Sequence, residues 1–376
     1  MNVSKRIVGI ELSIRKISDM AASVPGCVRF DIGQPDFKTP RNICDAAVRA
    51  IKDGYHGYTP VTGIAPLRQA IADYEMGKGI DVYDKNVMVT MGGMGAIFTI
   101  VLGFLEPSDE VVFPDPTWPP YKLIVSSVGG VAKLVPYFDD SGALDVDAIS
   151  NAVTSRTKFV VVNTPENPTG RVIGKNDLQA IAQVCEDKGV MIISDEVYDR
   201  ILFDGARHVS IKKYAGDNAI LVNSVSKTYA MTGWRVGWMV ASEEIIGQLM
   251  KCNRASVACP NSVSQYAALE ALTGAQTAVD KMVSEYGKRK NLVVKLMDKM
   301  SWDYVVPHGA FYAFPKVCDD SWKYTLALME KGGVSVVPGL PSGPSGEGYV
   351  RFCFGAADCA QIREGFERIE KFEDGS

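Results

Sequence analysis

Residues 219–235 read AILVNSVSKTYAMTGWR, a short apolar run followed at once by hydroxyl side chains, a lysine and an arginine. The length and the β-branched residues of the apolar run predict a buried strand. After it, Ser224, Ser226 and Arg235 can donate hydrogen bonds to an anion. A lysine at a strand end near other cations is placed to have the pKa of its amine lowered, which makes Lys227 a candidate nucleophile. A solvated lysine in a serine-rich turn is the alternative for this stretch alone.

The same order, an apolar strand and then polar residues, recurs through the middle of the chain with helical segments between the strands. Strands are predicted at residues 87–90, 110–113, 158–162 and 190–193. Such repeats indicate a largely parallel sheet. Because ligands bind outside the carboxyl ends of strands in open α/β sheets, the residues after these strands should converge on one pocket. They are the Gly92 loop, Trp118, Asn167, Asp195 with Tyr198, and the segment from Ser224 to Lys227.

A glycine-rich loop, MGGMG at residues 91–95, joins the first of these strands to a predicted helix. Free backbone N–H groups and the helix dipole favour an anion at a helix N-terminus, so the amides of Gly93 and Met94 are candidate phosphate ligands. A glycine turn without a ligand explains the loop equally well. The G-x-G-x-x-G fingerprint of dinucleotide-binding proteins is absent, which argues against a dehydrogenase.

Length and composition bound the size and class of the protein. The chain has 376 residues, of which 47% are hydrophobic, so it can bury a large core, and two domains are expected. A formal net charge of -4 and the lack of a basic run argue against a nucleic-acid partner. The three histidines have no metal-ligand spacing, so no transition-metal site is expected.

Two features concern the cellular compartment. Eight cysteines are scattered without a CxxC pair, which is typical of reduced intracellular thiols. Near the N-terminus, charges interrupt the apolar positions, so this segment predicts neither a signal peptide nor a membrane span. We therefore expect a cytoplasmic protein that does not associate with membranes.

The predicted pocket would combine an aromatic plate, a carboxylate, a phenol, an amide, a lysine and an anion-binding loop. A flat, phosphorylated aromatic aldehyde with a ring nitrogen fits this set, and pyridoxal phosphate is such a molecule. Lys227 would bond to the aldehyde, Asp195 would pair with the ring nitrogen, and Trp118 would stack on the ring. Asn167 and Tyr198 would hydrogen-bond the phenolic oxygen. The phosphate would be held by Ser224, Ser226, Arg235 and the amides of Gly93 and Met94.

Each of these residues also has a purely structural interpretation. Asp195 could cap a helix, Trp118 could pack in a core, and Asn167 could form a turn before Pro168. Their joint occurrence at successive strand ends favours the cofactor interpretation.

Together these motifs resemble those of class I and II aminotransferases, the aspartate-aminotransferase-like group of fold-type I pyridoxal-phosphate enzymes. Ser224–Lys227 with Thr232–Gly237 is similar to the family's lysine signature. Asn167–Gly170 and Asp195–Tyr198 resemble its two cofactor-binding strands. The resemblance covers nearly the whole chain and implies pyridoxal 5'-phosphate as the cofactor. It implies that Lys227, Asp195 and Tyr198 are catalytic.

Three further segments resemble family elements that contact the substrate or the neighbouring subunit. Gly33 lies in a segment similar to the N-terminal loop near the substrate carboxylate, and Arg351 in one whose arginine grips the α-carboxylate. With Asn167, they would bind the substrate. Tyr58 resembles a tyrosine that reaches the phosphate of the neighbouring subunit, which implies a homodimer with shared active sites.

The resemblance also implies a fold and its domains. We expect an α/β protein whose large domain, residues 46–279, has a mostly parallel seven-stranded sheet flanked by helices. A smaller α+β domain would be formed by both chain ends, with residues 1–45 joining residues 280–376.

The reaction implied is transfer of an α-amino group between an L-amino acid and a 2-oxo acid. One pair would be glutamate and 2-oxoglutarate, and the other an aspartate-type or aromatic amino acid. Relatives acting on aspartate can carry a lysine where this chain has Met94, whereas Arg254 has the spacing of an arginine that binds a distal carboxylate in the partner's site. Met94 therefore argues against an acidic substrate, whereas Arg254 argues for one. A carbon–sulfur or β-eliminating lyase shares the same cofactor cage and is the alternative.

Overall fold

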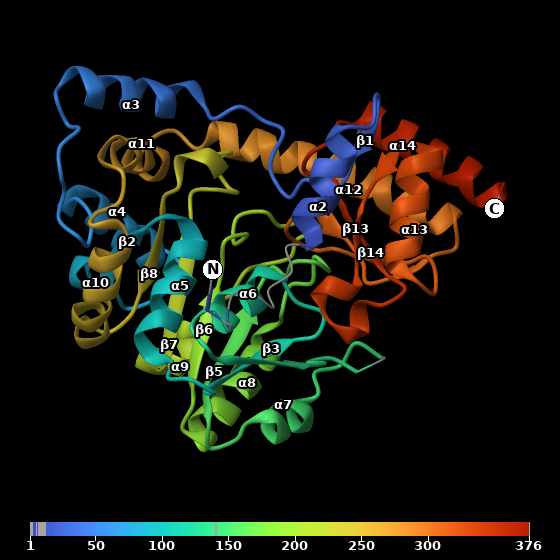
Figure 1. Ribbon diagram of the computed structural model, residues 1–376. Coiled ribbons are helices and arrows are strands. Elements are labelled where there is room, and N and C mark those ends of the chain that lie inside the picture. Colours follow the sequence, from blue (N-terminus) through green and yellow to red (C-terminus); the bar gives the residue numbers. More distant parts are fainter. Residues whose placement is uncertain (1–2, 5, 7–12, 140, 376) are drawn as a thin grey trace.

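A seven-stranded sheet forms the centre of the computed structural model, which describes residues 3–4, 6, 13–139 and 141–375 (Figure 1). Its strands follow in the spatial order β2-β8-β7-β6-β5-β3-β4. Their bounds are β2 Val87–Thr90, β3 Glu110–Pro114, β4 Val131–Val135, β5 Thr157–Asn163, β6 Met191–Asp195, β7 Ala219–Ser224 and β8 Gly237–Val240. In this sheet β8 runs antiparallel to both neighbours, and the other neighbouring strands are parallel. The predicted mostly parallel seven-stranded sheet is confirmed.

Helices cover both faces of this sheet, because successive side chains of a strand point to opposite faces. On β6, Ile193 belongs to the apolar core of one face and Ile192 to that of the other. The first face is covered by α5 (Gly92–Phe104), α6 (Pro120–Ser127) and α10 (Glu243–Val257). The second face is covered by α7 (Val146–Ala152), α8 (Lys175–Lys188) and α9 (Lys212–Ala215). The polar residues that end the parallel strands therefore lie between two apolar layers.

Four further helices belong to a core that joins the sheet to the C-terminal part. They are α3 (Arg41–Lys52), α4 (Ala65–Met76), α11 (Ser262–Thr273) and α12 (Thr277–Lys299). Short 3-10 turns fill the connections, namely η1 Asp84–Asn86, η2 Gly216–Asn218, η3 Thr232–Trp234, η5 Leu340–Ser342 and η6 Pro344–Gly346. A π-helical turn, η4, covers Leu328–Gly332.

The two ends of the chain meet in a smaller α+β unit (Figure 1). Here β1 (Val28–Arg29) pairs in parallel with β12 (Val334–Ser335), which joins the N-terminal segment to the C-terminal one. The other strands are β9 (Asp303–Tyr304), β10 (Tyr312–Ala313), β11 (Pro315–Lys316), β13 (Val337–Pro338) and β14 (Val350–Cys353). Its helices are α2 (Ser13–Ala22), α13 (Ser321–Ala327) and α14 (Cys359–Asp374). The predicted fold class is confirmed, while the boundaries after residues 45 and 279 stay predictions.

Two further observations concern the sequence-based expectations. No helix in the described ranges has both the length and the apolar character needed to cross a bilayer. All eight cysteines are free thiols. Burial raises the pKa of the Cys185 thiol to about 12, so that side chain stays protonated and packs as a small apolar group.

Candidate active site

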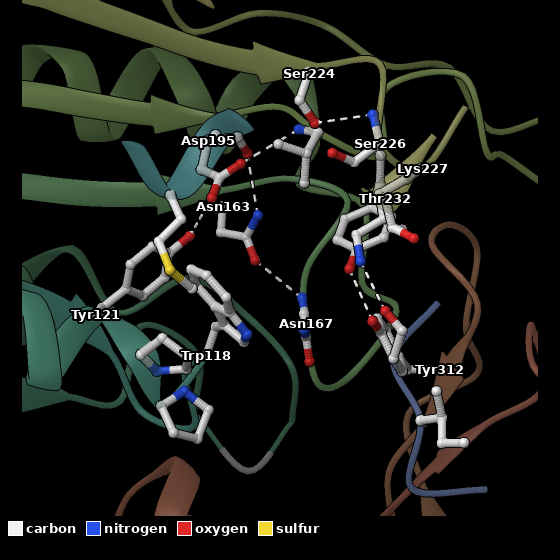
Figure 2. A pocket seen from close by; sticks show the side chains of 18 of the residues that line it. Trp118, Tyr121, Asn163, Asn167, Asp195, Ser224, Ser226, Lys227, Thr232 and Tyr312 are labelled. Atoms are coloured by element: carbon white, nitrogen blue, oxygen red, sulfur yellow. Dashed lines mark hydrogen bonds between the residues drawn. The ribbon is translucent and has the colours of Figure 1, made fainter. Parts of the chain in front are cut away.

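The carboxyl ends of the parallel strands open into a cavity of about 610 Å³ (Figure 2). It lies where the large sheet meets loops from both chain ends. The predicted site residues that line it are Gly33, Gly93, Met94, Trp118, Asn167, Asp195, Tyr198, Ser224, Ser226, Lys227, Arg235 and Arg351. The convergence expected from the order of the strands is therefore present in one cavity.

Lys227 stands in the turn that follows β7 and points its amine across the cavity. Its Nζ donates a hydrogen bond of 2.7 Å to the carbonyl of Gly33. Burial lowers the pKa of the Lys227 amine to about 8, and the nearby guanidinium groups of Arg351 and Arg235 act in the same direction. With this pKa about a tenth of the amine is neutral, and so nucleophilic, at pH 7.

Asp195 ends β6 on the opposite side of the cavity. The hydroxyl of Tyr121 donates to its Oδ2 at 2.6 Å, and the amide of Val197 donates to its Oδ1 at 3.3 Å. Burial raises the pKa of the Asp195 carboxyl to about 6. A cationic nitrogen placed beside this carboxylate would lower that pKa again, because opposite charges favour the ionised form.

A third group of side chains surrounds Arg351, which reaches the cavity from β14. Its Nη1 donates to Asn167 Oδ1 at 3.2 Å, and its Nη2 donates to the Asp31 carbonyl at 3.1 Å. The guanidinium lies 4.7 Å from the ring centroid of Tyr312, whose hydroxyl is 2.8 Å from that of Tyr198. Arg351 Nε is buried without a hydrogen-bond partner among the described residues. This arginine therefore has donor capacity left for a planar anion.

The predicted anion-binding elements also lie together. Helix α5 begins at Gly92 without a side-chain cap, so its first amide N–H groups are open toward the cavity. Arg235 donates to the carbonyls of Thr232 at 2.8 Å and Met91 at 3.3 Å, which holds its guanidinium over this helix end. A Cβ on Gly92 would lie 2.7 Å from Arg235 Nη2, so only glycine permits this approach.

Two predicted residues do not line this cavity. Tyr58 is 93% exposed in the loop between α3 and α4. Arg254 is exposed on the last turn of α10. Because both were predicted to act on the site of a second subunit, their roles stay predictions.

Several lining residues escaped the sequence reasoning. Tyr121 lies three residues after Trp118, in the first turn of α6, and lines the same cavity. Asn163 ends β5 and donates to the Asp195 carbonyl at 3.1 Å. Tyr312 and Arg15 come from opposite chain ends, and no local pattern in the sequence connects either residue to the strand ends.

Comparison with known proteins agrees with this geometry. The family model described as aminotransferase class I and II matches residues 25–369. An aromatic-amino-acid aminotransferase 2 of Thermococcus litoralis is 37% identical, over 99% of this chain and 98% of that protein. An aspartate aminotransferase of Pyrococcus horikoshii is 36% identical, over 99% and 97%. The solved aspartate aminotransferase from Thermus thermophilus with maleate superposes with a TM-score of 0.93 at 31% identity, covering 99% of this chain and all of that one.

The sheet topology and the lysine and aspartate at neighbouring strand ends define a fold-type I enzyme. With a family match over most of its length, the chain belongs to the aminotransferase class I and II family. The predicted resemblance is confirmed.

Proposed function

We propose that this chain transfers an α-amino group between an L-amino acid and a 2-oxo acid with pyridoxal phosphate as its cofactor. The observation that carries the proposal is the placement of Lys227, Asp195 and Arg351 around one cavity. An amine with a lowered pKa, a buried carboxylate and a guanidinium fork are the groups that amino-group transfer requires.

The residues present fit this cofactor. The uncapped start of α5 and the guanidinium of Arg235 supply donors for a phosphate. Asp195 supplies a buried carboxylate whose raised pKa a ring nitrogen cation would relieve. Trp118 stands edge-on to Tyr121, with ring centroids 5.1 Å apart and planes at 88°, and borders the cavity as an apolar wall for a flat ring.

When bound, pyridoxal phosphate supplies an electrophilic aldehyde and an electron-accepting ring. Lys227 would bond to that aldehyde at rest and, once released by substrate, would move a proton at the substrate Cα as general base and acid. Asp195 would hold the proton on the ring nitrogen. The hydroxyl of Tyr198, which is hydrogen-bonded to that of Tyr312, would face the phenolic oxygen of the cofactor.

Arg351 would bind the α-carboxylate of the substrate. Its planar fork matches a carboxylate better than the two acceptors it now contacts, the Asp31 carbonyl and the Asn167 amide oxygen. The Gly33 carbonyl, which now accepts from Lys227, lies on the same side of the cavity.

We further propose glutamate and 2-oxoglutarate as one substrate pair and an aspartate-type or aromatic amino acid as the other. Relatives named for both aspartate and aromatic amino acids support this range. Apolar residues Ile32, Met94 and Leu123 line the cavity beside the cation Arg15, which suits either kind of side chain.

A homodimer in the cytoplasm completes the proposal. Apolar side chains on and after α3 are unusually exposed, namely Val48, Ile51, Tyr55 and Tyr58. Exposed apolar groups gathered within a short stretch of chain are typical of an interaction surface. The free thiols support a reducing compartment.

The test is a coupled assay with a panel of amino acids, 2-oxoglutarate and added cofactor. Lys227→Ala should lower the turnover number by at least about 100-fold, the size of a lost general base, while Lys281→Ala on the exposed face of α12 should not. Wild-type rates in Lys227→Ala would overturn the proposal. Release of ammonia and a 2-oxo acid without any acceptor would instead identify the lyase alternative.

A further inference from the structure

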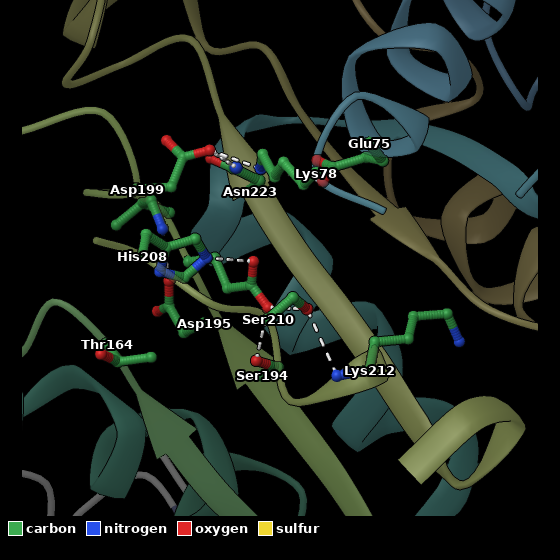
Figure 3. A network of polar contacts seen from close by, with 12 residues as sticks. Glu75, Lys78, Thr164, Ser194, Asp195, Asp199, His208, Ser210, Lys212 and Asn223 are labelled. Atoms are coloured by element: carbon green, nitrogen blue, oxygen red, sulfur yellow. Dashed lines mark hydrogen bonds and ion pairs between the residues drawn. The ribbon is translucent and has the colours of Figure 1, made fainter. Parts of the chain in front are cut away.

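A lysine with a buried amine, which the proposed reaction does not use, lies on the segment after α4. The Nζ of Lys78 is 2.8 Å from Glu75 Oε2 and 2.5 Å from Asp199 Oδ2 (Figure 3). The side chains of the two acids are 0% and 2% exposed. One ammonium therefore compensates two carboxylates that water cannot reach.

From this ion pair, hydrogen bonds lead to the end of β7. Asp199 Oδ2 also accepts from the Tyr74 hydroxyl at 2.6 Å and from Asn223 Nδ2 at 2.9 Å. The other end of that amide, Asn223 Oδ1, accepts from the backbone N–H of Ser224 at 2.7 Å. Ser224 is the last residue of β7 and begins the turn that carries Ser226 and Lys227. A continuous path therefore runs from a buried ammonium to the backbone of the proposed phosphate site.

The charges in this path depend on one another. Burial works to lower the pKa of Lys78, but the surrounding carboxylates, Asp199 first, outweigh it and raise that pKa. Burial likewise disfavours the ionised form of Asp199 and works to raise its pKa. The Lys78 ammonium favours the ionised form, and the pKa of that carboxyl is lowered. Without the ammonium, both buried acids would lose their ion-pair partner, and Asp199 would gain a proton or turn away from Asn223.

We propose that Lys78 is a positioning residue: through Asp199 and Asn223 it fixes the backbone at Ser224, and so the turn from Ser224 to Lys227 that receives the cofactor phosphate. This inference rests on the function proposed above. It predicts a specific loss of phosphate recognition, in addition to the loss of stability that any broken buried ion pair causes.

The chain offers a matched control at the opposite end of the same strand. Lys212 Nζ donates to the carbonyls of Gly216 at 3.1 Å and Ala219 at 2.8 Å. Ala219 is the first residue of β7, whereas Asn223 lies next to its last. Lys212 is therefore also a buried lysine tied to β7, but it contacts the end remote from the cavity (Figure 3).

The experiment compares Lys78→Met and Lys212→Met as apoproteins. Thermal unfolding should show a lower Tm for both variants. Titration with pyridoxal phosphate should show a dissociation constant raised at least about tenfold in Lys78→Met, as for a lost hydrogen bond to a charged group, and little changed in Lys212→Met. Pyridoxal, which lacks the phosphate, should lose less affinity for Lys78→Met than pyridoxal phosphate does.

The possible outcomes separate failure of the inference on Lys78 from failure of the proposed function. Equal affinity for pyridoxal phosphate in Lys78→Met and wild type, or equal losses in both lysine variants, would overturn the inference. Should Lys78→Met fail to fold, Asn223→Ala keeps the ion pairs and should show the same phosphate-specific loss, and unchanged affinity there would overturn it. A wild-type protein that binds no pyridoxal phosphate would refute the proposed function itself.

Discussion

At the scale of single residues, the Lys227 amine combines burial with nearby positive charge. Both effects disfavour the ammonium form, and the pKa falls to about 8. An ordinary lysine titrates near 10.4 and is almost wholly protonated at pH 8. The environment of the cavity therefore creates, without any bound group, an amine that is ready to react.

This difference predicts a distinct pH dependence. In the apoprotein, reductive methylation of Lys227 should reach half its maximal rate near pH 8, because only the neutral amine reacts and it predominates above the pKa. Peptide mapping by mass spectrometry measures the rate, with the solvent-exposed Lys281 labelled in the same sample as reference. Parallel pH profiles for the two lysines would contradict the prediction.

A second prediction at this scale concerns the distal carboxylate of acidic substrates. Arg15 of α2 lines the cavity, where the glycine loop contributes the uncharged side chain of Met94. We expect Arg15→Ala to lower kcat/KM for aspartate and glutamate by roughly tenfold and to leave aromatic substrates unchanged, as for loss of a charge-assisted contact. Asp19, which also lines the cavity one turn further along α2, is the control, since Asp19→Asn should raise kcat/KM for acidic substrates.

The same substrate panel decides the role of Arg254. A loss confined to acidic substrates in Arg254→Ala would support the prediction that it acts in the partner's site. Equal losses for all substrates, or no loss, would exclude that role.

The positions of site residues were predictable where a side chain ends a strand, as Asp195 does, or lies within four residues of a strand end, as Asn167 and Lys227 do. The position of the strand end then fixes the position of the side chain. Tyr312 could not be found in this way, because its contact with Tyr198 joins two segments more than a hundred residues apart. Such contacts depend on how the smaller unit packs against the sheet, which local periodicity does not encode.

At the scale of elements, the approach of β8 to the start of α5 determines whether the anion site can form. A Cβ on Gly237 would lie 2.5 Å from the carbonyl carbon of Gly92 and 2.6 Å from the nitrogen of Gly93. Real contacts of that length do not occur, so strand and helix would have to separate. The glycine of β8 is therefore as necessary to the site as the glycines of the loop.

Gly237→Ala should accordingly weaken cofactor binding and lower Tm together. Gly247 in α10 provides the control, because no atom lies within 4 Å of the Cβ it would gain. Gly247→Ala should stabilise the protein by about 0.5–1 kcal/mol through its helix and leave cofactor affinity unchanged. Calorimetry and cofactor titration measure both effects, and an unaltered affinity in Gly237→Ala would refute the argument.

The elements themselves were predictable to different degrees. The predicted strands at 87–90, 110–113, 158–162 and 190–193 correspond to β2, β3, β5 and β6, since each is a continuous apolar run. By contrast, β4 is a partly exposed edge strand with a lysine at its centre. The two-residue strands of the smaller unit carry no periodic signal at all.

At the scale of the whole molecule, the proposed homodimer predicts active sites that need both subunits. Tyr58 is too far from its own cavity to line it and is almost fully exposed. Sedimentation should give a particle of twice the 40.8 kDa chain mass. In Tyr58→Ala, cofactor affinity should fall by roughly tenfold, the size of a lost hydrogen bond to a charged group.

Mixing experiments sharpen this prediction. Lys227→Ala and Tyr58→Ala are each expected to be impaired, but a mixed dimer would contain one site with both residues intact. Activity that reappears on mixing the two variants, and not on concentrating either alone, would establish sharing between subunits. Failure of any mixture to recover activity, despite exchange of subunits, would count against it.

The pairing of β1 with β12 has a consequence for biosynthesis. Val28 leaves the ribosome roughly 300 residues before Val334, the residue beside which it lies in the finished protein. At about 5–20 residues per second, this interval is on the order of 15–60 s. During that time the whole central sheet emerges, while the N-terminal segment has no strand to join. The nascent chain therefore completes the central sheet first and the smaller unit last. Premature termination near the C-terminus would leave β1 without its partner strand β12.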